Sequence, residues 1–495
     1  MTGTTPLAGG DPATPPAGWM RLLHEPARPR GIATRPNAHW YVVGTVCIGA
    51  FMGQLDASIV TLAFPTLQHA FNASLGAVTW VGLSYLLVLV GLVTAVGSVA
   101  DMIGRKLLYI YGFGVFIAGS ALCGLAPNLP VLDAFRVLQA VGAAMLQANS
   151  VAIIALAMPR DRLGRGIGIQ GAAQALGLAL GPAAGGLLIA LGGWRLIFFV
   201  NVPVGAVGAV LGWFLIPRSR HLRPRHRFDW AGLCMFLPAV VALLYAVSFG
   251  DADGWGSPLI IGPLAASLVL AAAFVRHERR SPGPMLDLSL FRSVPFSAGV
   301  LSGLLAYAVM FGTLFAVPFY LERSVGLGAG ITGLELTTVP VGLGVVAVLA
   351  GRAADRLGAR PLTVLGMLLA AAMLALLAAG HPTGVALLLP LAGLGAGLGL
   401  FVPPNNAAIM GSAPRLHAGA ASGVLNMTRG LGTAMGLAFV GLVFDLGAGV
   451  DAAAGVARGF TDAAVFLAVV ALAAAAVAAV RGGGNLERRA TPQGE

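Results

Sequence analysis

The sequence predicts an all-α membrane protein of 14 transmembrane helices, arranged as two six-helix bundles with an inserted helix pair between them. Three observations support this fold class. Hydrophobic residues make up 57% of the 495 residues and charged residues only 10%, whereas soluble domains contain about 25% charged residues. Fourteen apolar segments are long enough to cross a bilayer. Two sequence patterns recur at nearly the same spacing, which indicates an internal repeat.

The predicted spans follow from the length of apolar sequence that one helix needs to cross a membrane, about 20 residues. They are residues 40–62, 76–98, 105–126, 129–156, 164–190, 196–216, 229–249, 257–275, 294–320, 331–350, 361–380, 384–410, 417–445 and 460–480. The resulting organisation is a disordered cytoplasmic tail at 1–39, an N-terminal six-helix bundle at 40–216, two extra helices with basic loops at 217–293, a C-terminal six-helix bundle at 294–480 and a second cytoplasmic tail at 481–495.

Basic residues orient these spans. When both tails and every second loop are assigned to the cytoplasm, that side holds 25 of the 30 Lys and Arg residues, and the opposite loops hold only Arg195, Arg323 and Arg458. Because cytoplasmic loops are enriched in Lys and Arg, we expect a multi-pass protein of the cell (inner) membrane with both termini cytoplasmic. The basic residues are spread over short loops, so the net charge of +11 does not indicate nucleic-acid binding.

The repeat relates the two predicted bundles. GSVADMIGRKLL at 97–108 aligns with GRAADRLGARPL at 351–362, which lies 254 residues later. The segment at 164–181 aligns with 419–436, which lies 255 residues later. The shift corresponds to eight helices, so the copies share one orientation, as in transporters whose bundles rock around a site at their interface. The repeat therefore favours transport.

Several motifs of the N-terminal bundle carry a family resemblance. They are LDASIVTLAFP (55–65), GSVADMIGRK (97–106), LDAFRVLQAVGAA (132–144) and GLALGPAAGG (177–186), the last followed by WRLIFFVNVP (194–203). The pattern resembles the major facilitator superfamily, and within it the fourteen-helix drug:proton antiporters of the EmrB/QacA type. Ser58, Thr61 and Ala140 depart from the residues usual in that group.

The resemblance implies a proton-coupled antiporter that exports lipophilic drugs or antibiotics by alternating access. It implies no cofactor, because the proton gradient supplies the energy. The expected partners are a lipophilic small-molecule substrate, protons and the lipid bilayer, and the protein is expected to be a monomer that does not bind nucleic acid.

Charged residues inside the spans are candidates for proton coupling. Asp56 lies about 9 Å deep and Arg136 about 10 Å deep from the same predicted outer side. An isolated charge inside a span is costly and usually has a partner, so we expect the two to pair and Asp56 to carry the proton. A static ion pair that only fixes two helices is the alternative. Glu335 is a candidate for a second proton site, or else an interfacial acid.

Polar and aromatic residues of the spans are candidates for lining a substrate cavity. They are Gln139, Gln170, Gln174, Phe311, Phe315, Asn405, Asn426 and Arg429. Arg429 lies near the membrane middle, too deep to reach the surface easily, and should face the cavity or a partner. Gln139 follows Arg136 by one turn, so it is expected to contact substrate, to orient the Arg or to join two helices by a hydrogen bond. Such a mostly neutral, apolar cavity favours bulky lipophilic ligands.

Glycines recur every four residues in the predicted span 164–190. Gly177, Gly181 and Gly185 form a smooth helix face beside Pro182, and Gly186 completes the motif. Such a face lets another helix pack closely and slide. In the family this helix packs at the interface of the two bundles and is linked to the direction of exchange; tight packing alone is the alternative.

Two short basic loops occupy equivalent places in the repeat. One contains Asp101, Gly104 and Arg105, and the other contains Asp355 and Gly358. The resemblance implies that both act as conformational latches, which pair in one state and release in the other. Ordinary basic cytoplasmic turns are the alternative. The spans 229–249 and 257–275 contain no internal charge, so we expect a peripheral pair without transport chemistry.

Other classes of function are less well supported. A metabolite importer or facilitator on the same scaffold is the first alternative, and the antiporter motif argues against it. A non-transporting receptor is the second, and the two loop motifs together with Asp56 and Arg136 argue against it. The sequence contains no phosphate-binding loop, nucleophile elbow or metal-ligand spacing, and its three cysteines lie in apolar segments. Neither an enzyme nor a metal site is predicted.

Overall fold

The computed structural model describes residues 28–35, 37–159, 162–218, 229–284, 286, 288–412, 418–448 and 452–480. All regular secondary structure within these residues is helical. Among them are 14 segments long and apolar enough to span a membrane, which confirms the predicted fold class and number of spans. The tails at 1–27 and 481–495 and the basic loop at 219–228 lie outside the described residues.

The helices of the N-terminal bundle follow the predicted spans closely. They are α1 (Arg30–Ala33), α2 (Ala38–Leu62), α3 (Phe64–Phe71), α4 (Leu75–Ile103), α5 (Arg105–Leu125), α6 (Leu129–Ala157), α7 (Leu163–Gly192), α8 (Leu196–Phe199) and α9 (Asn201–Leu215). The short helix α1 lies within the segment predicted to be a disordered tail. Side-chain caps start two of the spans in this bundle, because Ser74 accepts from the N–H of Ala77 and Asn128 from that of Val131.

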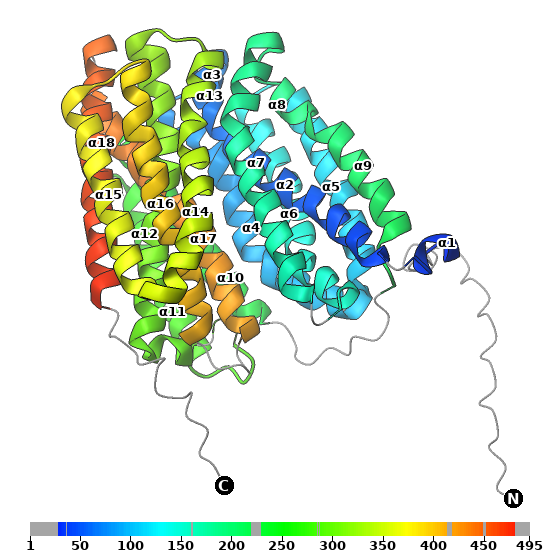
Figure 1. Cartoon of the computed structure of the whole chain (residues 1–495). Helices are drawn as coiled ribbons and strands as arrows, with labels where there is room; N and C mark the ends of the chain where they lie inside the picture. The colour runs from blue at the N-terminus through cyan, green and yellow to red at the C-terminus, as the bar shows by residue number, and fades with distance from the viewer. Residues whose placement is uncertain are drawn as a thin grey trace, which may run out of the picture.

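The remaining helices form the inserted pair and the C-terminal bundle. They are α10 (Trp230–Asp253), α11 (Pro258–Glu278), the short helix η3 (Leu288–Arg292), α12 (Val294–Phe319), the π-helical turn η4 (Tyr320–Val325), α13 (Ala329–Leu336), α14 (Thr338–Leu357), α15 (Ala359–Gly380), α16 (Val385–Ser412), α17 (Ala418–Ala448) and α18 (Ala452–Val480). In Figure 1 the two bundles stand side by side, with the N-terminal helices in blue to green and the last helices in yellow to red.

Proline accounts for the breaks in two of the spans. The sixth span stops at Phe199 and resumes at Asn201, and the tenth stops at Leu336 and resumes at Thr338. Pro203 and Pro340 each lie four residues beyond the last residue before the break. Since proline has no N–H, it cannot donate to the carbonyl four residues earlier, and the helix is interrupted at that point.

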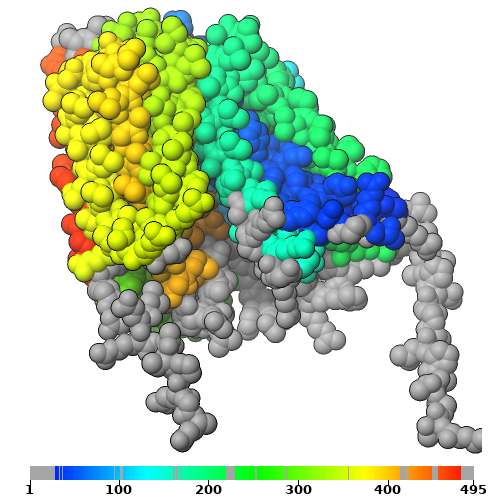
Figure 2. Space-filling view, in the orientation of Figure 1, coloured from blue at the N-terminus to red at the C-terminus, as the bar shows by residue number. Residues whose placement is uncertain are grey.

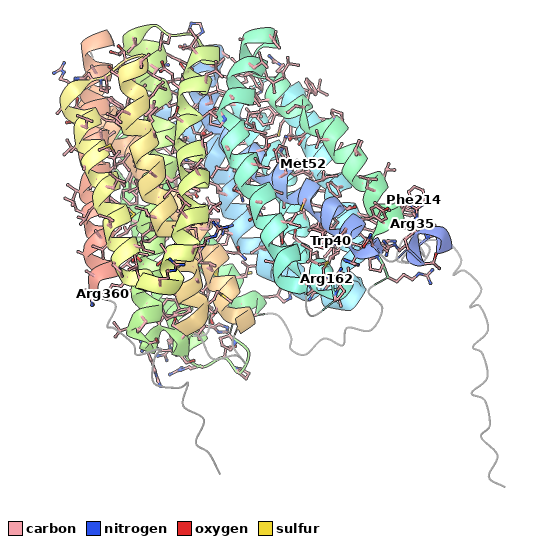
Figure 3. The ribbon with its side chains drawn as sticks, in the orientation of Figure 1. Arg35, Trp40, Met52, Arg162, Phe214 and Arg360 are labelled. Atoms are coloured by element: carbon pink, nitrogen blue, oxygen red, sulfur yellow. The ribbon has the colours of Figure 1, made fainter. Side chains whose placement is uncertain are left out.

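Basic residues of three predicted cytoplasmic segments gather at one end of the structure. Figure 3 shows Arg35, Arg162 and Arg360 toward the lower end, where α1 also lies, and Met52 nearer the middle. The last helix, α18, runs back to the same end (Figure 1). The described chain therefore starts and stops on one side, as an even number of spans requires.

The two bundles meet along two helix pairs, α7 with α13 and α4 with α17. In the first pair, Gly186 lies against the backbone carbonyl of Ala329, and Gly333 against that of Pro182. Near the second, the Phe64 and Phe315 rings lie 5.6 Å apart. These contacts lie toward the end opposite α1, the end at which Figure 1 labels α3 and α13.

The two inserted helices differ in how they pack on the bundles, because α10 contacts both of them. The rings of Tyr245 on α10 and Trp80 on α4 lie 6.2 Å apart, and Gly76 of α4 faces the carbonyl of Ser248. Helix α10 also packs on α17 of the other bundle. Helix α11 is at the periphery, with Leu268 73% exposed. Both helices are apolar on all sides, and such a helix gives no sequence signal for its partner.

The glycine stripe of α7 packs within its own bundle, while the helix as a whole also lies at the interface of the two bundles, where it packs on α13. Gly177 lies against the carbonyl of Phe51, Gly181 against Ser58, and Gly185 against the side chain of Ile59, all on α2. The neighbouring face, with Gly186 and the Pro182 carbonyl, is the one that meets α13. Small residues predicted a close contact, but they could not identify its partner.

Replacing Gly181 by Ala is expected to lower the thermal unfolding temperature of the purified protein, because its new Cβ would collide with Ser58 and overpacking costs about 1–3 kcal/mol. Gly171→Ala on the same helix is the matched control, since a Cβ there meets nothing within 4 Å. Both changes gain the same helix propensity. Equal unfolding temperatures for the two variants would contradict the close α2–α7 contact.

Candidate functional site

Asp56 and Arg136 form a buried ion pair in the N-terminal bundle. Asp56 lies on α2 and is 0% exposed, and Arg136 lies on α6 and is 1% exposed. Arg136 Nη1 donates to Asp56 Oδ2 over 2.6 Å. The two residues that the sequence placed at the same depth are therefore in direct contact.

Two amides complete the surroundings of the Asp56 carboxylate. Its Oδ1 accepts from Gln139 Nε2 at 2.8 Å and from Asn201 Nδ2 at 3.0 Å. Gln139 Nε2 also donates to Ser120 Oγ at 2.7 Å. Asn201 is the first residue of α9, so the break before Pro203 sets where this amide stands. Three helices besides α2 thus contribute to the network, and each oxygen of the carboxylate has a donor.

Arg136 is held on several sides as well. Its Nε donates to the carbonyl of Val81 at 2.9 Å, and its Nη1 donates to Gln139 Oε1 at 2.6 Å. Its guanidinium carbon lies 4.2 Å from the centroid of the Tyr85 ring, a cation–π distance. A buried charge is tolerated only when it is paired and hydrogen-bonded, and this one is both.

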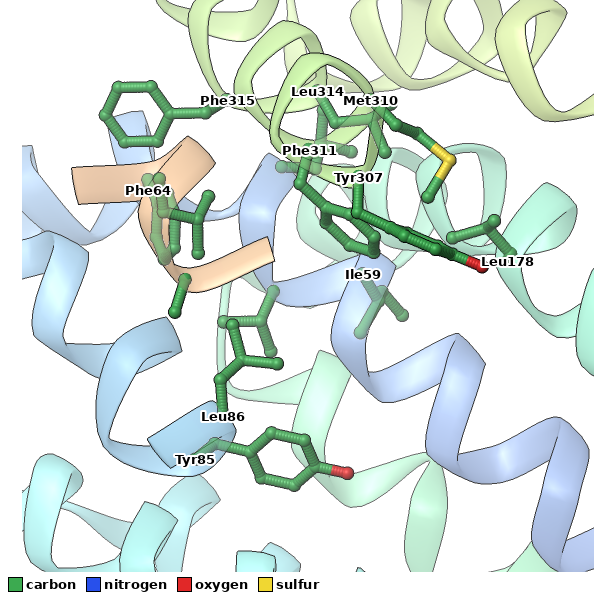
Figure 4. Close-up of a cluster of buried hydrophobic side chains, with 14 of the residues drawn as sticks. Ile59, Phe64, Tyr85, Leu86, Leu178, Tyr307, Met310, Phe311, Leu314 and Phe315 are labelled. Carbon is green, nitrogen blue, oxygen red and sulfur yellow. The ribbon is translucent and has the colours of Figure 1, made fainter. Parts of the chain in front are cut away.

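A small cavity lies beside this pair, between the two bundles. Its volume is about 10 Å³, and it is lined by Thr61, Tyr85 and Arg136 from one bundle and by Phe311 and Thr433 from the other. The Tyr85 hydroxyl is buried and has no hydrogen-bond partner among the described residues. This volume is close to the minimum for one water molecule. Figure 4 shows Tyr85, Leu86 and Phe311 within the apolar cluster around it.

A sequence profile of the Major Facilitator Superfamily matches residues 46–437 and, in a second alignment, 299–490. The chain belongs to the major facilitator superfamily. This superfamily transporter is 35% identical over 398 residues to the multidrug resistance protein Stp of Mycobacterium tuberculosis, covering 80% of this chain and 74% of Stp. It is 34% identical over 427 residues to the tetracenomycin C resistance and export protein of Streptomyces glaucescens, covering 85% of this chain and 78% of that protein.

A further relative of this superfamily transporter has a different named activity. The riboflavin transporter RibZ of Clostridioides difficile is 32% identical over 410 residues, which cover 82% of this chain and 88% of RibZ. Among solved structures, an inward-facing bacterial homologue of the lysosomal transporter Spinster matches with a TM-score of 0.67 and 15% identity, over 90% of this chain and 97% of that one. The superfamily resemblance is confirmed, and the protein is a multi-pass membrane transporter of small molecules.

Several residues that were predicted to line a substrate cavity of this superfamily transporter make contacts between its helices. Gln139 is fully buried in the Asp56 network, and Asn405 is buried within the C-terminal bundle, where its Nδ2 donates to the Gly299 carbonyl at 3.1 Å. Phe315 packs against Phe64, as described above, while Phe311 does line the small cavity.

The other predicted cavity residues have mixed surroundings. Gln170 is buried and its Oε1 has no hydrogen-bond partner among the described residues, Gln174 is half-buried, and Asn426 is exposed. Arg429 is half-buried, and its Nε donates to the hydroxyl of Tyr307 at 3.1 Å.

Glu335 is separate from the Asp56 network. It is half-buried on α13, the helix that packs on α7 at the seam, the surface along which the two bundles meet. Its Oε2 is buried without a hydrogen-bond partner in the described part of the chain. No described hydrogen bond or ion pair of Glu335 joins it to Asp56 or Arg136.

Each predicted latch loop is a single glycine between two helices. Gly104 separates α4 from α5 and has a φ of 117°, and Gly358 separates α14 from α15 with a φ of 80°. These values lie in the region that favours glycine, which explains the residue type at both places. Arg105 opens α5, whereas the side chains of Asp101 and Asp355 lie outside the described residues, so their latch role stays a prediction.

Gly104→Ala is expected to destabilise the protein by about 1–3 kcal/mol, because an L side chain is strained at a positive φ. Thermal unfolding in detergent measures the effect. Gly97→Ala in α4 is the control, since its φ is ordinary for a helix and a Cβ there meets nothing within 4 Å. An unfolding temperature for Gly104→Ala at or above that of the control would argue against a strained joint.

Sequence reasoning missed Ser120, Tyr85 and Asn201 as parts of the site. The sequence could have pointed to Asn201, because this residue lies in the WRLIFFVNVP segment that follows the antiporter motif. No sequence pattern distinguishes Ser120 or Tyr85, since single hydroxyl-bearing residues are common in apolar spans. No group of three or more potential metal-ligating side chains occurs in the part of the chain that the structure describes.

Proposed function

We propose that this superfamily transporter exports lipophilic small molecules in exchange for protons, and that Asp56 carries the coupled proton. The observation that carries the proposal is the buried network around Asp56. Ionisable residues in spans are costly to bury and usually serve function. Export of drugs or antibiotics is supported by the resistance and export proteins among the relatives. No cofactor takes part, because the proton gradient supplies the energy.

The network offers a physical link between proton binding and the bundle interface. Protonation of Asp56 removes the negative charge that holds Arg136, and leaves the guanidinium with neutral acceptors only. Arg136 also lines the cavity between the bundles. A change in its position therefore acts on the surface where the bundles meet, and the proton shifts the balance between two arrangements of that surface.

We propose further that both termini are cytoplasmic, as the basic loops predict. The end of the bundle contact at which Gly186 meets Ala329 then faces outward, and the opposite end faces the cytoplasm. Substrate enters from the cytoplasm in this arrangement and leaves after the bundles rock. The protein acts as a monomer in the bilayer. Glu335, at the seam on α13, is the candidate for a second proton site.

The relation to RibZ favours a second candidate function, transport of a metabolite such as riboflavin without opposed proton movement. Proteoliposomes that contain a pH-sensitive dye distinguish the two functions. A panel of lipophilic antibiotics with riboflavin included is added under an imposed proton gradient. Antiport predicts that a transported compound and protons move in opposite directions. Transport without opposed proton movement would overturn the proposal and support the alternative.

A further inference from the structure

We propose that Arg429 is the subsite for an acidic group of the substrate, so that the exported molecules are lipophilic organic acids. The proposal rests on the export function above and deepens it by naming the substrate class. It requires that Arg429 lies where a ligand can reach it, that its guanidinium has donors to spare, and that no carboxylate of the protein neutralises it.

Arg429 lies at the seam between the bundles. Its Nε donates to the Tyr307 hydroxyl at 3.1 Å, and its guanidinium carbon is 5.5 Å from the Tyr307 ring centroid. Tyr307, on α12, belongs to the same buried cluster as Ile59 and Leu178 of the N-terminal bundle, as Figure 4 shows. The pair of Arg429 and Tyr307 therefore stands in the C-terminal bundle on the side that meets the other bundle.

The guanidinium of Arg429 retains unused donors. Arginine has five N–H groups in one plane, and Nε has the one acceptor that the structure describes for this side chain. Among the described residues Arg429 has no ion pair, whereas Arg136 pairs with Asp56. Its two Nη groups are suited to bidentate binding of a planar carboxylate.

Arg136 provides the contrast within the same chain. Its guanidinium is neutralised by Asp56 and also donates to the Val81 carbonyl. Of the two arginines inside the predicted spans, Arg136 is paired with a carboxylate and Arg429 is not, so the excess positive charge lies at Arg429. A charge near the membrane middle is costly without compensation, so an anionic ligand gains binding energy there that a neutral one does not.

The surroundings of Arg429 leave one side for a ligand. Thr433, one turn further along α17, lines the cavity of about 10 Å³ beside Arg136, which holds no more than a water molecule. Asn426, one turn in the other direction, is exposed. The proposal therefore places ligand entry on the Asn426 side, which is the cytoplasmic side in the proposed orientation.

Equilibrium binding of two fluorescent probes tests the inference on the purified full-length protein. Anilinonaphthalene sulfonate carries an anionic group, and N-phenylnaphthylamine has the same ring system without it. Arg429→Gln is expected to weaken binding of the anionic probe about tenfold, the effect of about 1.4 kcal/mol, and to leave the neutral probe unchanged. Arg429→Lys should retain part of the preference, because it keeps the charge without the planar fork. Arg323→Gln, an exposed outer arginine, is the control.

A measurement on the unaltered protein covers the case in which Arg429→Gln does not fold. Naphthoate and naphthamide compete for the bound anionic probe, and naphthoate is expected to be the stronger competitor. Equal competition, or equal loss of both probes in the variant, would overturn the inference. Asp56→Asn separates the inference from the proposed function. A variant that loses proton release but still prefers naphthoate supports the subsite. Antiport by an unaltered protein that binds naphthoate and naphthamide equally would overturn the subsite and leave the export proposal intact.

Discussion

Asp56→Asn is expected to abolish substrate-driven proton release by reconstituted protein. Asn keeps the shape of the side chain, but it cannot exchange a proton, so the coupling carried by the 2.6 Å contact with Arg136 is lost. Proteoliposomes with an internal pH dye measure the release, and the expected signal is that of protein-free liposomes. The amides of Gln139 and Asn201 remain beside the replaced side chain.

Two comparisons make this result interpretable. Asp133→Asn changes another acid of α6 that is half-buried and has no described bond to Asp56, so proton release should persist. Glu335→Gln removes the second candidate carboxylate. Full proton release by the Asp56→Asn protein would refute Asp56 as the proton site; partial release that disappears in the double variant with Glu335→Gln would show that the two acids share the work.

Arg136→Gln is expected to destabilise the protein by about 3–5 kcal/mol, because it leaves the fully buried Asp56 without a cation. Thermal unfolding and the yield of folded protein measure the loss. The double variant Asp56→Asn/Arg136→Gln removes both charges and is expected to recover much of the stability. Arg323→Gln, at an exposed position, should change stability by no more than about 0.5 kcal/mol. A double variant as unstable as Arg136→Gln would show that the pair contributes little through charge.

The number and extent of the spans could be predicted from the sequence because crossing a membrane is a local requirement. Each span must be apolar over its own length, whatever its neighbours are. The contact between Asp56 and Arg136 could be predicted for a similar reason, since depth follows from counting residues and a buried charge needs a partner. The repeat then fixed which helices correspond.

The rotation and neighbours of each helix could not be predicted. A helix that is apolar on every side has no polar face to show which way it points, so the sequence did not reveal that α10 packs on both bundles. The glycines of α7 showed that a helix approaches closely, but α2 and α13 were equally possible partners. Asn201 joins Asp56 from 145 residues away, and such a contact depends on how α9 is placed against α2.

Helix α10 makes the two lines of contact between the bundles different, because it covers one of them and not the other. Helix α10 lies on both α4 and α17, and so covers their seam from the lipid side. The opposite seam, where α7 meets α13 and α14, is visible on the surface in Figure 2, with α7 in teal and α14 in yellow-green. The two seams are thus unequal: a molecule in the membrane would meet α10 over one of them and the bundle helices themselves at the other.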